Sequence, residues 1–389
     1  MNVVGLLIVA QILAQTAAIT FVTLSALIGF DLAANKLLAT LPLAIGMIAG
    51  AALTIPAASF MQRFGRRRGF MLGAVAGLCS AALAVAALRW QSFALFLAAS
   101  MAAGAYQACF QFYRFAAAEA VTAEQRARVL SYVVSGGIVA AFTGPAVARL
   151  AVAGDRAGYE LAFMILGVLA LVVLLVLARL PVHAAVSRPG QGVVRSFTTL
   201  AAQPVFVTAV TGSAVSIAVM SMIMSATPLA MQYCGLARVL SPGVIQWHMI
   251  GMFVPSLFTG EIVRRCGELP TMLCGVVILL LQLAVSTTGV TYPHFVVGLL
   301  LLGVGWNYLY IGGSTLLARA WRPGEEGRVQ AMHDMAVYAL ASLATTASGG
   351  LLTAWGWNAL NCVAAPALAI VLLAIGLQWR HRSQHSAGA

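Results

Sequence analysis

Long apolar stretches recur along almost the whole chain and constrain its fold more than any other feature. A helix that crosses about 30 Å of hydrocarbon needs roughly 20 apolar residues, and the sequence supplies twelve such stretches. They cover residues 4–28, 37–60, 69–88, 93–115, 129–152, 160–178, 205–227, 239–262, 270–287, 294–317, 329–352 and 358–379. We therefore predict an all-α membrane protein with twelve transmembrane helices.

The composition agrees with this expectation. Hydrophobic residues make up 61% of the 389 residues and charged residues only 8%, whereas a soluble domain carries about a quarter charged residues. The six cysteines stand singly along the chain, so the sequence indicates neither a disulfide framework nor a zinc site. No basic residue precedes the first apolar stretch and no cleavage pattern follows it, so we expect a retained helix and not a signal peptide.

The longest polar connection divides the chain into two groups of six stretches. It predicts an N-terminal bundle at residues 1–178, a cytoplasmic linker at 179–203 and a C-terminal bundle at 204–389. Of the 22 basic residues, 17 lie on the same side of the membrane as this linker and the two chain termini. By the positive-inside rule both termini are cytoplasmic. The net charge of +12 then needs no nucleic-acid partner, and we predict a multi-pass protein of a bacterial inner membrane.

Two short motifs of the first half return in the second. Residues 62–67 read Gln-Arg-Phe-Gly-Arg-Arg after the second stretch, and residues 264–268 read Arg-Arg-Cys-Gly-Glu after the eighth. An Arg-Val pair opens the fifth stretch at Arg128 and the eleventh at Arg328. Internal repeats of this kind are typical of transporters, so we expect two pseudo-symmetric bundles.

The first of these motifs resembles the signature of the major facilitator superfamily between helices two and three, Gly-x-x-x-Asp-Arg-x-Gly-Arg-Arg. The matching residues are Arg63, Gly65, Arg66 and Arg67. The chain departs from the signature with Ala58 at the first glycine and Gln62 at the acidic position. The resemblance spans the whole chain and implies alternating access between two six-helix halves. Drug efflux is disfavoured, because Ser100 stands where the drug antiporters of this family carry an arginine.

The same resemblance implies a set of gating and coupling residues. The first-half signature and its echo at Arg265 and Gly267 would control opening at the cytoplasmic side. We also predict an ion pair between Arg114 and Glu119 near the base of the fourth helix, with a solvated helix edge as the alternative. Asp334, at the start of the eleventh helix, is a candidate proton-coupling group, and a hydrogen-bonded helix end is the alternative there.

Two pairs of soft donors in neighbouring stretches are the main functional candidates. Met220 and Met224 lie four residues apart, as do His248 and Met252, so each pair shares one helix face. Thioethers suit Cu(I) and discriminate against hard cations, and imidazole also binds copper. The alternatives are methionines that only fill the core and a neutral His248 bonded to a hydroxyl of a neighbouring helix.

These pairs resemble those of the CcoA-type copper importers, a branch of the same superfamily that supplies copper for a haem-copper oxidase. Members carry MxxxM in helix seven and HxxxM in helix eight, and a thiol corresponding to Cys234. The resemblance implies a non-enzymatic transporter with no resident cofactor, with copper as its substrate and a cytoplasmic copper chaperone as a candidate partner in addition to the lipid bilayer. A related branch transports riboflavin and lacks the metal pairs.

Helices seven and eight run antiparallel, so the four predicted ligands lie at different depths in the membrane. We call Met224, Met220, His248 and Met252 the ladder. At 1.5 Å per residue, Met224 lies outermost, Met220 and His248 lie level, and Met252 lies deepest. We expect Met224 to capture copper, Met220 with His248 to form the central site, and Met252 to pass the ion inward. Further candidates for a relay are Cys234, Met332, His333 and Met335.

Two other functions stay open at this point. One is import of a small organic solute such as riboflavin, in which the methionines would serve only as packing. The other is a non-transporting sensor or receptor, although the sequence offers no soluble signalling domain for that role.

Overall fold

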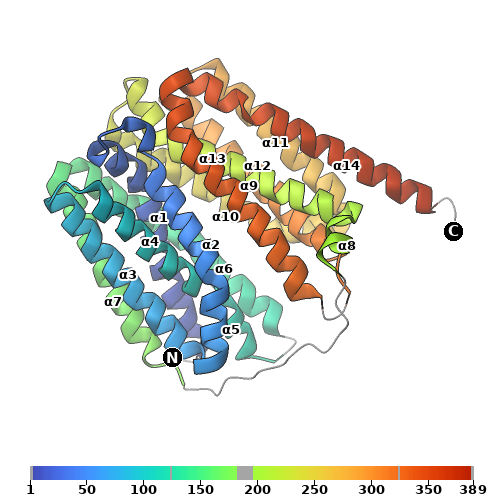
Figure 1. The fold of residues 1–389 in the computed structure, drawn as a ribbon, viewed down its shortest axis with the longest axis horizontal. Helices are drawn as coiled ribbons and strands as arrows, with labels where there is room; N and C mark the ends of the chain where they lie inside the picture. The colour runs from blue at the N-terminus through green and yellow to red at the C-terminus, as the bar shows by residue number, and fades with distance from the viewer. Residues whose placement is uncertain (1–2, 123–124, 182–195, 323–324, 387–389) are drawn as a thin grey trace. The chain divides into compact units, whose positions relative to one another are not determined.

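The computed structural model describes residues 3–122, 125–181, 196–322 and 325–386, and every regular element within these ranges is a helix (Figure 1). Ten segments of the described chain are long and apolar enough to cross a membrane. One of them, Met332–Gln384, contains most of the eleventh and all of the twelfth predicted helix. The prediction of an all-α membrane protein is confirmed, and the orientation of its termini stays a prediction.

The helices of the first half follow the predicted stretches closely. They are α1 Val3–Leu32, η1 Lys36–Leu38, α2 Leu41–Phe64, α3 Arg66–Arg89, α4 Phe93–Phe110, α5 Tyr113–Glu119, α6 Arg126–Ala153 and α7 Asp155–Leu177. The fourth predicted helix is interrupted at Gln111 and Phe112, which separate α4 from the short α5. Both residues at the interruption keep right-handed helical backbone angles, and Phe93–Ala117 still counts as one of the ten segments.

The second half contains the remaining elements. They are α8 Phe197–Ala201, α9 Pro204–Tyr233, η3 Arg238–Leu240, α10 Ser241–Cys266, α11 Glu268–Thr288, α12 Tyr292–Leu317, α13 Glu326–Cys362 and α14 Ala364–Ser386. Gly356 interrupts α13 with a φ of +78°, a backbone conformation that favours glycine. This break falls between the predicted eleventh and twelfth helices. Polar residues such as Gln246 and His248 lower the hydropathy of α10, which is absent from the ten segments.

The chain forms two compact units. The first contains Met1–Ser187 and Met231–Gln246, and the second contains Arg188–Ala230 and Trp247–Ala389. In the first unit α3 packs against α4 and α7, α2 against α4, and α1 against α6; in the second α11 packs against α12, α13 and α14. The predicted division at 178 and 204 stays a prediction, and residues 182–195 of its linker lie outside the described residues.

Glycines let several helices approach at backbone distance. A Cβ atom on Gly104 of α4 would lie 2.8 Å from the backbone nitrogen of Gly50 in α2, and closer still to the carbonyl oxygen of Gly46. A Cβ atom on Gly303 of α12 would lie 2.5 Å from the carbonyl oxygen of His248 in α10. Small residues at such crossings are the usual means by which membrane helices pack closely. The second crossing also fixes the backbone of α10 at His248.

The two copies of the repeated motif have the same backbone geometry. Gly65 joins α2 to α3 with a φ of +90°, and Gly267 joins α10 to α11 with a φ of +91°. Each glycine combines a positive φ with an extended ψ, a conformation open essentially to glycine alone, and so separates two helices with a single residue. The repeated glycine therefore has the same structural role in both halves.

Candidate functional site

His248 is the most deeply buried of the predicted ligands. Its side chain in α10 has no exposed surface, and its Nδ1 lies 2.9 Å from the carbonyl oxygen of Leu299 in α12. Since a carbonyl oxygen can only accept, Nδ1 carries the proton and Nε2 presents a lone pair. No hydrogen-bond partner for Nε2 is found among the described residues. The imidazole is bonded to backbone, not to the hydroxyl considered above.

The three methionines of the predicted ladder lie in the same compact unit as His248. Met220 is buried in α9, while Met224 of α9 and Met252 of α10 are half-buried. The described residues contain no group of three or more His, Cys, Asp or Glu side chains that could hold a metal ion. A metal would therefore depend on thioethers and His248, and the predicted level of Met220 with His248 stays a prediction.

Cys234 is the predicted relay thiol between the two ligand pairs. It follows the end of α9, is half-buried and belongs to the first unit. Burial raises the pKa of its thiol, and a neutral thiol is a poorer metal ligand than a thiolate. The structure thus does not bring Cys234 and the four predicted ligands into one unit.

An aromatic cluster on α12 and α13 was not predicted. The rings of Trp306 and Tyr310 are stacked with centroids 5.2 Å apart and an interplanar angle of 9°, and the ring of His333 lies 6.5 Å from Tyr310. Trp306 and Tyr310 are half-buried, whereas His333 is buried. The i, i+4 spacing of the two aromatic residues was the available sequence signal. We call these three residues the α12–α13 aromatic cluster.

The aromatic cluster carries polar atoms that no described residue satisfies. Trp306 Nε1 and His333 Nε2 are buried without a hydrogen-bond partner in the described chain, although such atoms usually have one. His333 Nδ1 lies 2.8 Å from Asp334 Oδ1. Of the neighbouring relay candidates, Met332 is half-buried and Met335 is 71% exposed.

Asn307 ties α12 to α10 beside these residues. Its Nδ2 donates to the carbonyl oxygen of Met252 at 2.9 Å and to the hydroxyl of Ser256. The hydroxyl of Thr259 donates to its Oδ1. Both the amide nitrogen and the amide oxygen of Asn307 therefore bond α10, and the nitrogen holds the backbone of the predicted ligand Met252.

The predicted ion pair between Arg114 and Glu119 is wrong. Glu119 accepts from Arg66 Nη2 at 2.5 Å and from Arg66 Nε at 3.2 Å, while Arg114 lies over the ring of Phe115 at 4.8 Å. Residues five apart on a helix point in directions about 140° apart, so Arg114 and Glu119 do not share a face of α5. The link instead joins the signature motif at the start of α3 to the end of α5.

The other residues of the two motifs have more exposed positions. Arg63 is exposed and lies over the ring of Phe64 at 5.3 Å, and Arg67 is half-buried. In the second copy Arg265 binds Glu261 on the same helix at 2.5 Å. The gating role of these arginines stays a prediction that rests on their positions in the two motifs.

Glu268 is the buried carboxylate of the second motif, and the sequence did not single it out. Its side chain is 8% exposed; Arg319 Nη2 lies 2.7 Å from Oε1, and Arg382 Nη1 lies 3.5 Å from Oε2. Arg319 follows the end of α12, and Arg382 lies in the last turns of α14. The carboxylate of Glu268 at the start of α11 therefore links three helices. Spacing along the chain gave no signal for this pairing.

We expect Glu268→Gln to cost more stability than Glu119→Gln. The pair of Arg66 and Glu119 has 36% and 58% of its side chains exposed, and exposed pairs contribute about 1 kcal/mol or less. The carboxylate of Glu268 is buried and forms ion pairs with Arg319 and Arg382, and loss of the charge of a buried partner is more costly than loss of an exposed one. Thermal unfolding of both variants in detergent measures the difference. An equal loss in the two variants would contradict the assignment.

The whole chain matches a known protein family. The family model described as "Major Facilitator Superfamily" matches residues 6–254 and 211–389. The chain belongs to the major facilitator superfamily. The predicted family and fold are therefore confirmed, and this chain is a secondary transporter by family.

Relatives of this major facilitator protein include a named transporter. The riboflavin transporter RfnT of Brucella anthropi is 33% identical over 380 residues, which cover 96% of this chain and 94% of the relative. The uncharacterized MFS-type transporter YdeG of Bacillus subtilis is 27% identical over 365 residues, covering 89% of this chain and 84% of YdeG. These matches do not support the copper-importer branch, which stays a prediction.

Solved structures agree with the fold of this superfamily member. The nucleoside transporter NupG, in a point-mutant form, has a TM-score of 0.76 at 15% identity, covering 97% of this chain and 99% of NupG. A bacterial homologue of the iron transporter ferroportin, in its inward-facing state, has a TM-score of 0.70 at 13% identity, with 97% and 98% coverage. At this identity the likeness concerns the fold alone.

Proposed function

We propose that this protein imports a small, planar organic solute of the riboflavin class by alternating access. The observation that carries the proposal is the 33% identity to the Brucella anthropi riboflavin transporter over 96% of the chain. This is the solute that the sequence left open as the alternative to copper. The four soft donors would then have a packing role.

The α12–α13 aromatic cluster supports this solute class. The stacked rings of Trp306 and Tyr310 offer a face on which a flat heteroaromatic ring gains dispersion and stacking energy. Trp306 Nε1, without a partner in the described chain, can donate to a carbonyl oxygen at the edge of such a solute. His333 Nε2, also without a described partner, can accept from a ring N–H of the solute when Nδ1 donates to Asp334. Buried polar atoms of this kind select against rings that lack the matching groups.

The solute has a consequence for the energy source. An inside-negative membrane potential is worth about 2.3 kcal/mol per charge per 100 mV, but riboflavin carries no net charge. Accumulation would therefore need a coupling ion or chemical trapping inside the cell. The hydrogen-bonded pair of His333 and Asp334 is the candidate for proton coupling, because it lies beside the aromatic cluster.

Growth of a bacterial strain that can neither make nor import riboflavin tests the proposal. We expect the chain to restore growth at a riboflavin concentration that does not support the empty-vector strain. Absence of rescue by a chain that is detected in the membrane fraction would contradict import of riboflavin.

Import of copper is the second candidate, and His248 is the observation that favours it. A buried imidazole whose Nδ1 donates to a backbone carbonyl, while Nε2 has no partner in the described chain, has the arrangement in which histidine binds a metal. In this proposal Met224 captures Cu(I), Met220 and His248 hold it, and Met252 releases it. A cytoplasmic copper chaperone would then receive the ion.

Substitution of the ladder separates the two candidates. If copper is the substrate, Met220→Leu and His248→Ala should each reduce uptake of radioactive copper under reducing conditions to the empty-vector level. Met101→Leu is the matched control, because Met101 is 54% exposed in α4. Copper uptake that is equal in all variants, or equal to empty vector in wild type, would contradict the second candidate.

A further inference from the structure

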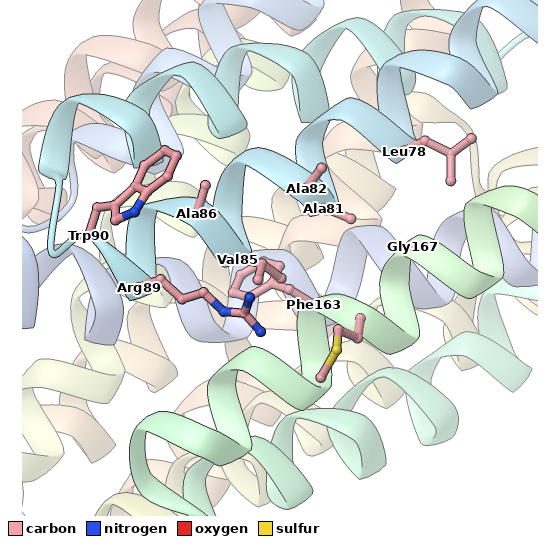
Figure 2. A pocket seen from close by; sticks show the side chains of 10 residues that line it. Leu78, Ala81, Ala82, Val85, Ala86, Arg89, Trp90, Phe163 and Gly167 are labelled. Atoms are coloured by element: carbon pink, nitrogen blue, oxygen red, sulfur yellow. The ribbon is translucent and has the colours of Figure 1, made fainter.

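A groove of about 570 Å³ runs between α3 and α7 of the first unit (Figure 2). Its floor is made of small residues: a Cβ atom on Gly167 of α7 would lie 3.4 Å from the Cβ of Ala81 in α3, so the two helices nearly touch there. Ala82 and Ala86 lie on the same side of α3 and do not fill the surface above the contact. The groove is therefore a consequence of small side chains on two closely packed helices.

The groove faces the side on which a membrane helix meets lipid. Both Arg66–Arg89 and Arg156–Leu177 are long and apolar enough to cross a membrane, and Ala82 is exposed. Trp90, at one end of the groove, is 73% exposed. Exposed tryptophans and arginines at the ends of such helices mark the level of the lipid headgroups. The end with Arg89 and Trp90 is thus the headgroup end, and Leu78 lies at the opposite, apolar end (Figure 2).

Two exposed arginines, Arg89 and Arg156, lie at the headgroup end of the groove. Arg89 Nε donates to Glu160 Oε2 at 3.0 Å, and Arg156 Nε lies 3.9 Å from Glu160 Oε1. Arg156 Nη2 also donates at 2.6 Å to the carbonyl oxygens of Leu88 and Arg89, which holds it at the end of α3. The arginine side chains are 61% and 52% exposed, and Arg89 reaches across the groove from α3 toward α7 (Figure 2).

We propose that this groove binds an anionic phospholipid, with one acyl chain along the alanines and the headgroup phosphate at Arg89. Arg89 uses its Nε to bond Glu160 and has further N–H donors on an exposed guanidinium, which can bond a phosphate oxygen with charge assistance. A zwitterionic lipid brings its own ammonium group and gains less. The acyl chain fits because the lining is almost entirely apolar.

Lipid retention by the purified full-length chain tests this proposal. The protein is mixed in detergent with equal amounts of phosphatidylglycerol and phosphatidylethanolamine. Native mass spectrometry then measures the fraction of protein that carries each lipid. We expect wild type to retain phosphatidylglycerol preferentially. Arg89→Gln should reduce that preference about fivefold, since one arginine near a lipid headgroup contributes about 1 kcal/mol. Ala82→Phe should reduce retention of both lipids, because the ring fills the acyl groove.

Two controls keep the result specific. Arg380→Gln removes one exposed arginine from α14 and should leave lipid retention unchanged, and the melting temperature of Ala82→Phe shows whether its fold is intact. The proposal is overturned if folded Ala82→Phe retains phosphatidylglycerol like wild type, if wild type retains both lipids equally, or if a dimer replaces the lipid-bound monomer.

Discussion

Replacing Trp306 by alanine should raise the apparent KM for riboflavin about 30-fold, because stacking of a flat heteroaromatic ring on an aromatic side chain is worth about 2 kcal/mol. The effect is large because Trp306 supplies one of two stacked faces and also the indole Nε1, which has no partner in the described chain. Initial rates of labelled riboflavin uptake in whole cells, over a range of concentrations, measure the change.

Two further variants separate a binding role from a general packing role. Trp306→Phe keeps a ring face but removes the donor, so we expect a loss smaller than that of Trp306→Ala. Trp355→Ala, which removes a tryptophan that is 65% exposed on α13, should leave uptake unchanged. Equal KM values for Trp306→Ala and wild type would remove the α12–α13 aromatic cluster from the solute site.

The largest loss of stability is expected for Gly104→Val, at about 3 kcal/mol or more. The added Cβ would meet backbone atoms of Gly46 and Gly50 in α2, and backbone cannot move aside as the end of a flexible side chain can. The crossing of α2 and α4 would have to open along its length. Thermal unfolding of purified protein in detergent measures the change.

Gly376→Val is the matched control for this substitution. Gly376 lies in α14, and no atom of a neighbouring element would lie within 4 Å of an added Cβ atom among the described residues. Both variants place the same β-branched side chain in a long helix, so any intrinsic cost of valine in a helix cancels. If the two variants melt at the same temperature, the close approach of α2 and α4 is not what stabilises the first unit.

Much of the fold could be predicted because each membrane helix corresponds to one continuous apolar stretch of about 20 residues in the sequence. The repeated motifs predicted two pseudo-symmetric bundles, and Gly65 and Gly267 have nearly equal φ angles in the two copies. The interruption at Gln111 and Phe112 between α4 and α5 could not be predicted. No glycine or proline marks it, and the predicted stretch 93–115 runs through it.

Interactions between distant residues account for what the sequence did not reveal about the sites. Glu119 was assigned to Arg114, its neighbour in sequence, but it binds Arg66, which is 53 positions away. The partner of His248 is a backbone carbonyl 51 positions away, and side-chain chemistry carries no signal for such a bond. The pairing of Trp306 with Tyr310 followed helix spacing, whereas the approach of His333 from α13 required the packed structure.

Parallel uptake of labelled riboflavin and of radioactive copper, by cells that express the chain and lack their own importers of both solutes, tests the central proposal most directly. The proposal predicts riboflavin uptake well above empty vector, reduced by Trp306→Ala and unchanged by Met220→Leu. Riboflavin uptake at the empty-vector level, together with copper uptake that Met220→Leu and His248→Ala abolish, would contradict it and favour the ladder as the transport path.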